Sequence, residues 1–185
     1  MEDPVKEIAS VVKGLVSARD ATEQKACLEA YFTPDASFDH PLCSVSSSPN
    51  SRDAGLLPIY QWLRCMFNPD IQVHQVGFDE RNNKLFLDVT QRLTPNLYPL
   101  SKLYAPVVRL VVVLQLQRGA DGRFYVKSQE DFYEPQVIPF GLVPGLGWVT
   151  SAVKRVIGFN CSVLTTLTQV GLGYWKPVKG GKAKK

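Results

Sequence analysis

Cysteine and histidine are too few and too scattered in this sequence to build a metal site. The 185 residues include two histidines and four cysteines, with no CxxC motif. Cys27, Cys43, Cys65 and Cys161 lie far apart, so their spacing predicts neither bound zinc nor a disulfide framework, and free thiols fit a reducing compartment. Nucleophile motifs and glycine-rich phosphate loops are absent too. We therefore expect no metal ion and no cofactor.

Positive charge is scarce outside the C-terminal end. The last ten residues, "KPVKGGKAKK", hold five lysines and no acid, so the rest of the chain carries −1 of the net charge of +4. Nucleic-acid-binding domains spread positive charge over a folded face, so we expect no nucleic-acid partner. The N-terminal "MEDPVKEIAS" has no apolar signal core, which favours a cytosolic protein over a secreted one.

Signals for three helices come first along the chain. Asp3 reads as an N-cap followed by proline, and apolar residues then recur at helical spacing as far as Leu15. Asp20 and Glu23 form an acidic variant of the capping box, which opens a second helix. After "YFTPDASFDHPLC" and a polar loop, "LLPIYQWLRCMF" predicts a third helix with Pro58 in its first turn.

From residue 71 the apolar residues alternate with a period of two, which is typical of strands. "IQVHQVGFD" and "KLFLDVTQRL" flank the polar turn "ERNN", and "PVVRLVVVLQLQR" and "GRFYVKSQEDFY" flank "GADG". Both arrangements predict β-hairpins. Helix, helix, strand, helix and then a four-stranded antiparallel meander is an α+β order, and we assign it to one domain over residues 1–134.

This order, with "YFTPDASFDHP" after the second helix, resembles the nuclear transport factor 2-like superfamily, which includes the SnoaL-like proteins. The fungal SigF-like members resemble it more closely, through the "MEDPV" start, an "LQR…DGR" turn, an "SQ.D.Y" last strand and an apolar C-terminal extension. The resemblance implies a cone: a curved antiparallel sheet wrapped around three N-terminal helices, with an internal cavity. It implies little about chemistry, because the superfamily includes isomerases, dehydratases and cyclases as well as binding and scaffold proteins.

Enzymes of this superfamily usually place His, Asp or Tyr inside the cone, where desolvation shifts the pKa of the side chain. Strand alternation puts four polar residues on one face of the last strand: Tyr125, Gln129, Asp131 and Tyr133. If that face looks into the cone, Asp131 and His40 could face each other as an acid/base pair, and they are the predicted catalytic residues. The predicted ligand-binding residues are Tyr125, Gln129, Tyr133, Trp62 and Arg109.

The same residues also allow a structural interpretation. Asp35 and Asp39 lie beside prolines and suit turns, because their carboxylates can accept hydrogen bonds from nearby backbone N–H groups. That interpretation favours His40 as a hydrogen-bonded residue at the strand start. Arg109, inside "VVRLVVV", needs a partner or a route to water. The partner could be an anionic ligand group, or more simply an acid on the next strand such as Glu130.

The C-terminal extension, residues 135–175, is uncharged except for Lys154 and Arg155. Its two uncharged stretches approach the length of a bilayer span, but a span centred on these two residues would cost about 2.5–3.5 kcal/mol for each. Apolar residues recur every three or four positions from Val149 to Val170, which predicts an amphipathic helix lying in an interface. The predicted membrane-contact residues are Phe140, Leu142, Leu146, Trp148, Trp175 and Lys176. Residues 176–185 are expected to form a basic disordered tail.

Three functional hypotheses follow. The first is a non-catalytic cytosolic protein, held on an intracellular membrane or lipid droplet, that binds a hydrophobic small molecule or a protein partner. The second is a cofactor-free isomerase, dehydratase or cyclase that uses His40 and Asp131. The third is a structural subunit whose extension docks into a homodimer or a larger assembly. An open cavity with a polar side chain inside it favours chemistry, whereas a filled cone would exclude it.

Overall fold

The computed structural model describes residues 1–133 and 147–171 of the chain. Asp3 and Asp20 cap the first two helices, as predicted, by accepting hydrogen bonds from backbone N–H groups of the first turn. Pro58 lies in the first turn of the third helix, where a missing N–H costs nothing. The helical segments are α1 (Pro4–Val16), α2 (Ala21–Tyr31), a π-helical turn η1 (Arg52–Leu56), α3 (Leu57–Met66), the short α4 (Leu100–Leu103) and α5 (Gly147–Gly171).

Six strands form one sheet in the order β2-β1-β6-β5-β4-β3. They are β1 (Phe32–His40), β2 (Cys43–Val45), β3 (Phe67–Asp79), β4 (Lys84–Pro95), β5 (Val107–Arg118) and β6 (Phe124–Tyr133). The predicted hairpins β3–β4 and β5–β6 are both present, and the α+β class is confirmed. One detail differs from the predicted antiparallel sheet, because β1 pairs with β6 in parallel.

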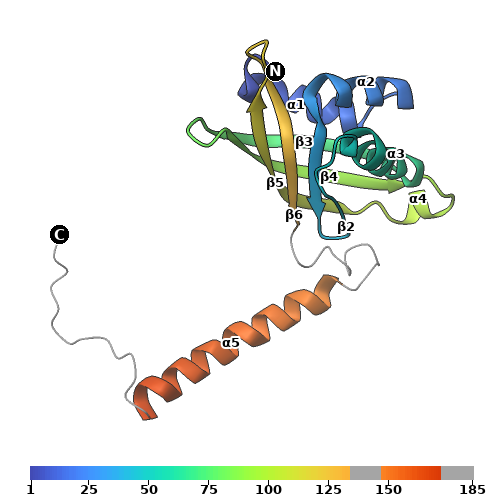
Figure 1. The fold of residues 1–185 in the computed structure, drawn as a ribbon. Coiled ribbons are helices and arrows are strands. Elements are labelled where there is room, and N and C mark those ends of the chain that lie inside the picture. The colour runs from blue at the N-terminus through green and yellow to red at the C-terminus, as the bar shows by residue number, and fades with distance from the viewer. Residues whose placement is uncertain (134–146, 172–185) are drawn as a thin grey trace.

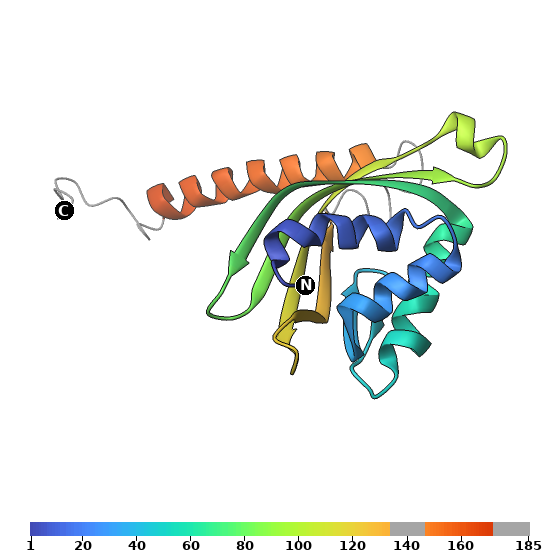
Figure 2. The same ribbon diagram turned by 90° about the horizontal axis from the view of Figure 1, so that it is seen from above.

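The long strands bend around helices α1 to α3 and leave the sheet unclosed (Figures 1 and 2). Between the concave face of the sheet and these helices lies the apolar core. Ile8, Val11 and Leu15 of α1 are almost fully buried there, together with alternate residues of β4 and β5. The amino group of Met1 donates a 2.7 Å hydrogen bond to the carbonyl of Phe124, which fixes the start of the chain against β6.

A β-bulge in β6 decides which side chains of that strand face the core. Lys127 is the extra residue, because its neighbours on β6 pair with consecutive residues of β5. Phe124 and Val126 therefore point to the concave face before the bulge, and Gln129 takes the same face after it. Tyr125 lies on the other side of the sheet. Simple alternation assigned Tyr125 to the face of Gln129, and the bulge makes that assignment wrong.

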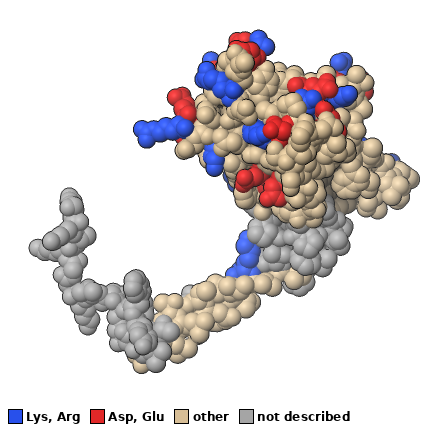
Figure 3. Space-filling model, in the orientation of Figure 1, with Lys and Arg blue, Asp and Glu red and all other residues tan. Residues whose placement is uncertain are grey.

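Helix α5 presents apolar side chains to its surroundings. The exposed ones are Val153, Val156, Ile157, Phe159, Val163, Leu164, Leu167 and Val170. In Figure 1 the helix stands apart from the cone, and the visible face of the helix in Figure 3 is tan apart from blue atoms toward its N-terminal end. The sequence of the helix contains two charged residues, Lys154 and Arg155. None of the helices in the described part of the chain is both long and apolar enough to cross a membrane.

Candidate functional site

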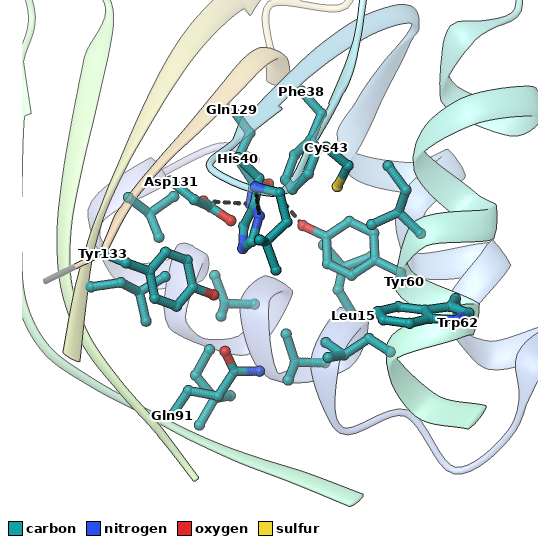
Figure 4. A pocket seen from close by; sticks show the side chains of 18 of the residues that line it. Leu15, Phe38, His40, Cys43, Tyr60, Trp62, Gln91, Gln129, Asp131 and Tyr133 are labelled. Atoms are coloured by element: carbon teal, nitrogen blue, oxygen red, sulfur yellow. Dashed lines mark hydrogen bonds between the residues drawn. The ribbon is translucent and has the colours of Figure 1, made fainter. Parts of the chain in front are cut away.

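A cavity of about 530 Å³ opens between the concave face of the sheet and helices α1 and α3. Most of its lining is aliphatic or aromatic, with Leu110 and Val112 of β5 opposite Leu15 of α1. Among the described residues that line it, Asp131 is the one acid, and lysine and arginine are absent. A few polar side chains are grouped in this apolar surrounding, as the close view in Figure 4 shows. Largely apolar pockets with few convergent polar groups are typical of small-molecule sites.

A chain of hydrogen bonds runs along one side of the cavity. The hydroxyl of Tyr60, on α3, donates to Oε1 of Gln129 over 2.8 Å. Nε2 of Gln129 in turn donates to Oδ1 of Asp131 over 2.9 Å. Tyr60 and Gln129 are both buried, so each bond replaces hydration that the side chain has lost. The chain fixes the amide of Gln129 and aims its N–H group at the carboxyl of Asp131.

Asp131 is the titratable group best suited to chemistry near neutral pH. Burial raises the pKa of its carboxyl from the ordinary 3.8 to about 7, and the hydrogen bond from Gln129 only partly opposes that rise. At neutral pH the group is therefore present both as an acid and as a base. A carboxyl poised in this way can accept or return a proton without an extreme energetic cost.

His40, at the end of β1, lies at the same end of the cavity as Asp131 (Figure 4). Burial lowers the pKa of its imidazole. The backbone N–H of Leu42 donates to Nδ1 of His40 over 3.1 Å, so a neutral ring carries its proton on Nε2. The ring also stacks on Phe38 and meets the edge of Tyr133. This geometry favours His40 as a hydrogen-bond donor from Nε2 rather than as the base of the predicted pair.

Two further polar groups line the cavity without hydrogen-bond partners in the described part of the chain. One is the amide of Gln91, on β4, and the other is the hydroxyl of Tyr133, at the end of β6. Gln91 is only 4% exposed, and in Figure 4 the two polar ends lie on the same side of the cavity. Burial raises the pKa of the Tyr133 hydroxyl, which therefore stays protonated.

The mouth of the cavity is edged by exposed apolar side chains. Leu42, Trp62 and Met66 all line the cavity, and their exposed fractions of 57%, 59% and 48% show that they reach solvent too. The apolar segment around α4 lies beside them, because the side-chain amide of Asn96 donates to the carbonyls of Arg64 and Cys65 at the end of α3. Leu97, Tyr98, Leu100 and Leu103 of that segment are exposed as well.

Five of the seven residues predicted for catalysis or ligand binding line the cavity: His40, Asp131, Gln129, Tyr133 and Trp62. The other two do not line it. The hydroxyl of Tyr125 donates to Asp121 over 2.7 Å in an exposed turn. Arg109 points to the convex side of the sheet and forms a two-pronged ion pair with Asp88 of β4, with distances of 2.9 and 2.6 Å. The prediction that Arg109 pairs with Glu130 was therefore wrong, because the acid on the neighbouring strand is Asp88.

Most of the predicted membrane-contact residues lie outside the described residues, namely Phe140, Leu142, Leu146, Trp175 and Lys176. Trp148 lies in the first turn of α5. The described residues contain no group of three or more His, Cys, Asp or Glu side chains placed to hold a metal ion.

Sequence reasoning missed two of the polar cavity residues, Gln91 and Tyr60. Gln91 gave a signal, because it occupies a core-facing strand position between Val89 and Leu93, where an apolar residue is expected. A polar residue in such a register indicates either a buried hydrogen bond or a site. Tyr60 gave no comparable signal, since a tyrosine on an apolar helix face is ordinary core.

The fold is a curved, unclosed six-stranded sheet that bends around helices, with an apolar cavity between the sheet and the helices. This architecture is that of the nuclear transport factor 2-like class of proteins. Within that class, the chain belongs to the SigF NTF2-like domain family, whose model matches residues 1–174. Proteins with this fold commonly bind small molecules or catalyse reactions such as isomerisation. None of the curated proteins compared with the sequence matches it.

Several solved structures share the fold at low sequence identity. An M. tuberculosis LEH-like epoxide hydrolase is 13% identical with TM-score 0.53, and the match covers 81% of this chain and 99% of that one. AclR from Streptomyces galilaeus is 15% identical with TM-score 0.52, covering 87% and 98%. AusH from Aspergillus nidulans is 15% identical with TM-score 0.50, covering 70% and 82%. At this identity the likeness concerns the fold alone.

Proposed function

We propose that the cone binds an apolar small molecule in its cavity. The observation that carries this proposal is the open volume of about 530 Å³, lined by Leu110, Val112 and other apolar side chains around a few polar groups. A packed core normally leaves no void of this size. Transfer of an apolar ligand into it gains about 25 cal/mol for each Å² of apolar surface removed from water.

The exposed edge of the cavity supports the same proposal. Leu42, Trp62 and Met66 give an apolar ligand a continuous apolar path from the surface to the interior. Contiguous apolar side chains exposed at the mouth of a cavity are typical of ligand-binding sites, because their contact with water is unfavourable until a ligand covers them. The similar structures include an enzyme named as an epoxide hydrolase, which is consistent with a small-molecule site in this fold, but no reaction is carried over from it.

A pair of neighbouring tryptophan substitutions tests the proposal. Val112→Trp fills the cavity from β5, whereas Val111→Trp places the same bulk on the convex face, where Val111 is exposed. Methyl decyl ketone serves as the ligand and calorimetry measures its binding. We expect saturable binding by the wild type and by Val111→Trp, and at least tenfold weaker binding by Val112→Trp. Equal affinity in all three proteins would contradict binding in the cone.

Proton transfer next to a carbonyl group is the second candidate function, and the raised pKa of Asp131 favours it. The carboxylate would remove a proton from the carbon beside the carbonyl, which leaves an enolate. The enolate oxygen would accept a hydrogen bond from Nε2–H of His40, and Asp131 would then return its proton to carbon. The sequence hypothesis named the same two residues, but the Leu42 hydrogen bond to Nδ1 gives His40 the role of donor.

Deuterium exchange tests this reaction without knowledge of the natural substrate. In D₂O, the protons beside the carbonyl of methyl decyl ketone are followed by NMR in the presence of the protein. We expect exchange to accelerate as pH rises through about 7, as the Asp131 carboxylate forms, and to stop in Asp131→Asn. Glu130→Gln changes an exposed acid on the same strand and should leave exchange intact. Exchange that survives in Asp131→Asn would exclude Asp131 as the base.

We further propose that the protein works at the surface of an intracellular membrane or lipid droplet. Two exposed apolar surfaces support this placement: the described residues of α5, and the rim of the cavity with the α4 segment. Lipid contact along both would bring the cavity mouth to the source of an apolar ligand. Under this proposal residues 1–134 act as the binding domain and residues 135–175 as the surface anchor.

Liposome flotation of the full chain tests the membrane proposal. The double change Ile157→Asp with Leu164→Asp puts two charges among the exposed apolar side chains of α5. We expect the wild type to float in low and high salt, because apolar contact is not screened, and the double variant to stay at the bottom. A double change at two exposed glutamines, Gln75→Asp with Gln117→Asp, is the control. A wild-type chain that never floats would favour the third hypothesis, docking into a protein assembly.

A further inference from the structure

The polar groups of the cavity that lack partners indicate which kind of ligand it takes. Gln91 is 4% exposed and its amide has no hydrogen-bond partner among the described residues. Its register on β4 directs it inward with Leu87, Val89 and Leu93, and Figure 4 shows its amide pointing into the cavity. The amide faces the open cavity rather than another protein group, and polar groups buried in folded proteins usually meet water or a ligand.

Tyr133 supplies a second unpaired group on the same side of the cavity. Its ring is held by an edge contact with His40, with 4.8 Å between ring centroids, and its hydroxyl has no hydrogen-bond partner in the described part of the chain. Tyr133 lies opposite Leu110 on β5, and Gln91 lies opposite Val108 on the other edge of that strand. Their backbones are thus two strand spacings apart across the sheet and two residues apart along it, about 12 Å in all, which leaves room for a ligand group between the two side chains.

The charge of the lining disfavours an anionic group at this position. Both unpaired groups are neutral, and no lysine or arginine is among the described residues that line the cavity. The carboxyl of Asp131 lines the same cavity and would repel a second carboxylate or a phosphate. A buried anion without a cation or several donors is strongly disfavoured. An amide and a hydroxyl can instead both donate to, or accept from, a neutral oxygen.

We propose that Gln91 and Tyr133 form the subsite that holds a carbonyl or hydroxyl oxygen of a neutral, largely apolar ligand, and that the cavity rejects fatty acids and other lipid anions. This inference rests on the proposed binding function and adds the class of ligand to it. This subsite belongs to the binding function, whereas the proton-transfer candidate places the ligand oxygen at Nε2–H of His40 instead. The subsite fixes the orientation of the ligand, and the apolar walls supply most of the binding.

A matched set of twelve-carbon ligands tests the subsite. Methyl decyl ketone, dodecanol, dodecane and dodecanoate are compared by displacement of Nile red, a neutral dye, above neutral pH. We expect the ketone and the alcohol to bind about tenfold more tightly than dodecane, because they satisfy the unpaired amide. Dodecanoate should bind at least about a hundredfold more weakly than the ketone, since its charge has no partner.

Two variants assign the effect to named residues. Gln91→Leu keeps a similar volume and removes the amide, and Tyr133→Phe removes only the hydroxyl. Each should lower affinity for the ketone about tenfold while affinity for dodecane stays the same or rises. Gln117→Leu, the same change at an exposed position of β5, is the control and should alter nothing.

The outcomes separate this inference from the function on which it rests. If neither Nile red nor any of the four ligands binds, the proposed binding function itself fails. If dodecanoate binds as tightly as the ketone, the cavity binds ligands but the neutral-ligand assignment is wrong. An equal loss of dodecane and ketone affinity in Gln91→Leu would show that Gln91 only shapes the cavity. A Gln91→Leu protein that binds the ketone like wild type would equally overturn the subsite.

Discussion

The cone and helix α5 are both rich in apolar residues, but they place them in opposite environments. Leu87 of β4 is completely buried, whereas Leu164 of α5 is 60% exposed. In the cone, apolar side chains hold the sheet against the helices and surround a cavity. In α5 the described apolar side chains are exposed, and they do not contribute to the cone core. Composition alone does not distinguish the two uses, and only position in the fold does.

The largest expected effect on stability comes from a leucine-to-alanine substitution, made once in the cone and once in α5. Leu87→Ala removes buried methyl groups and should lower the free energy of unfolding by about 2–5 kcal/mol. Leu164→Ala should change it by less than about 0.5 kcal/mol, because its side chain is exposed. Urea unfolding measures both. A comparable loss of unfolding free energy in Leu164→Ala would show that α5 packs on the cone, and the two regions would then not differ in environment.

Asp131 makes stability of the cone depend on pH. Burial raises the pKa of its carboxyl from the ordinary 3.8 to about 7, so the folded state binds the proton more tightly than the unfolded state between these pH values. The contribution of the protonated Asp131 carboxyl to the stability of the wild-type protein is fully present below about pH 4 and is lost as the pH rises to about 7. Asp131→Asn should therefore gain up to about 4 kcal/mol relative to wild type across that window.

Urea unfolding of both proteins at several pH values checks this expectation. His40 is present in both, so its own titration cancels in the difference between them. Glu130→Gln serves as the matched control and should follow the wild-type curve. A difference between wild type and Asp131→Asn that does not change with pH would mean that the carboxyl is not held in a dry environment.

Tyr60→Phe tests the hydrogen-bond chain on the cavity wall. The change leaves the buried Oε1 of Gln129 without the 2.8 Å bond from the hydroxyl, which should cost about 1–2 kcal/mol of unfolding free energy. Tyr125→Phe removes a hydroxyl bonded in an exposed turn and should cost clearly less. Thermal unfolding measures both variants. Equal losses of stability in Tyr60→Phe and Tyr125→Phe would show that the hydroxyl of Tyr60 is as accessible to water as that of Tyr125.

The smallest effect is expected on the convex face of the sheet. Arg109 is largely exposed, so its ion pair with Asp88 should contribute less than about 1 kcal/mol and should weaken in salt. Arg109→Gln compared with wild type in low and high salt measures this contribution. A loss above about 2 kcal/mol would indicate that this face is covered in the folded protein and that α5 or a second chain lies on it.

Local signals in the sequence predicted most of the cone. The caps at Asp3 and Asp20 and the two hairpins depend on residues close together in the chain, and the structure confirms them. The resemblance to SigF-like members named the family correctly. The predicted division at residues 134 and 175 remains a prediction.

The errors concern features that short patterns do not encode. The bulge at Lys127 shifts alternation by one position, which removed Tyr125 from the cavity face and leaves Gln129 on it. Arg109 lies opposite Thr90 in the register, which puts Asp88 within reach and Glu130 beyond it. Register depends on pairing over long sequence distances, and a single sequence does not give it.

Methyl-resolved NMR during titration with methyl decyl ketone tests the central claim most directly, because it observes both regions at once. We expect saturable shifts of the methyl groups of Leu110 and Val112 in the cavity and none of Ile157 and Leu164 in α5. That result would place the ligand inside the cone. Shifts confined to α5, or no saturable shift anywhere, would contradict ligand binding in the cone cavity.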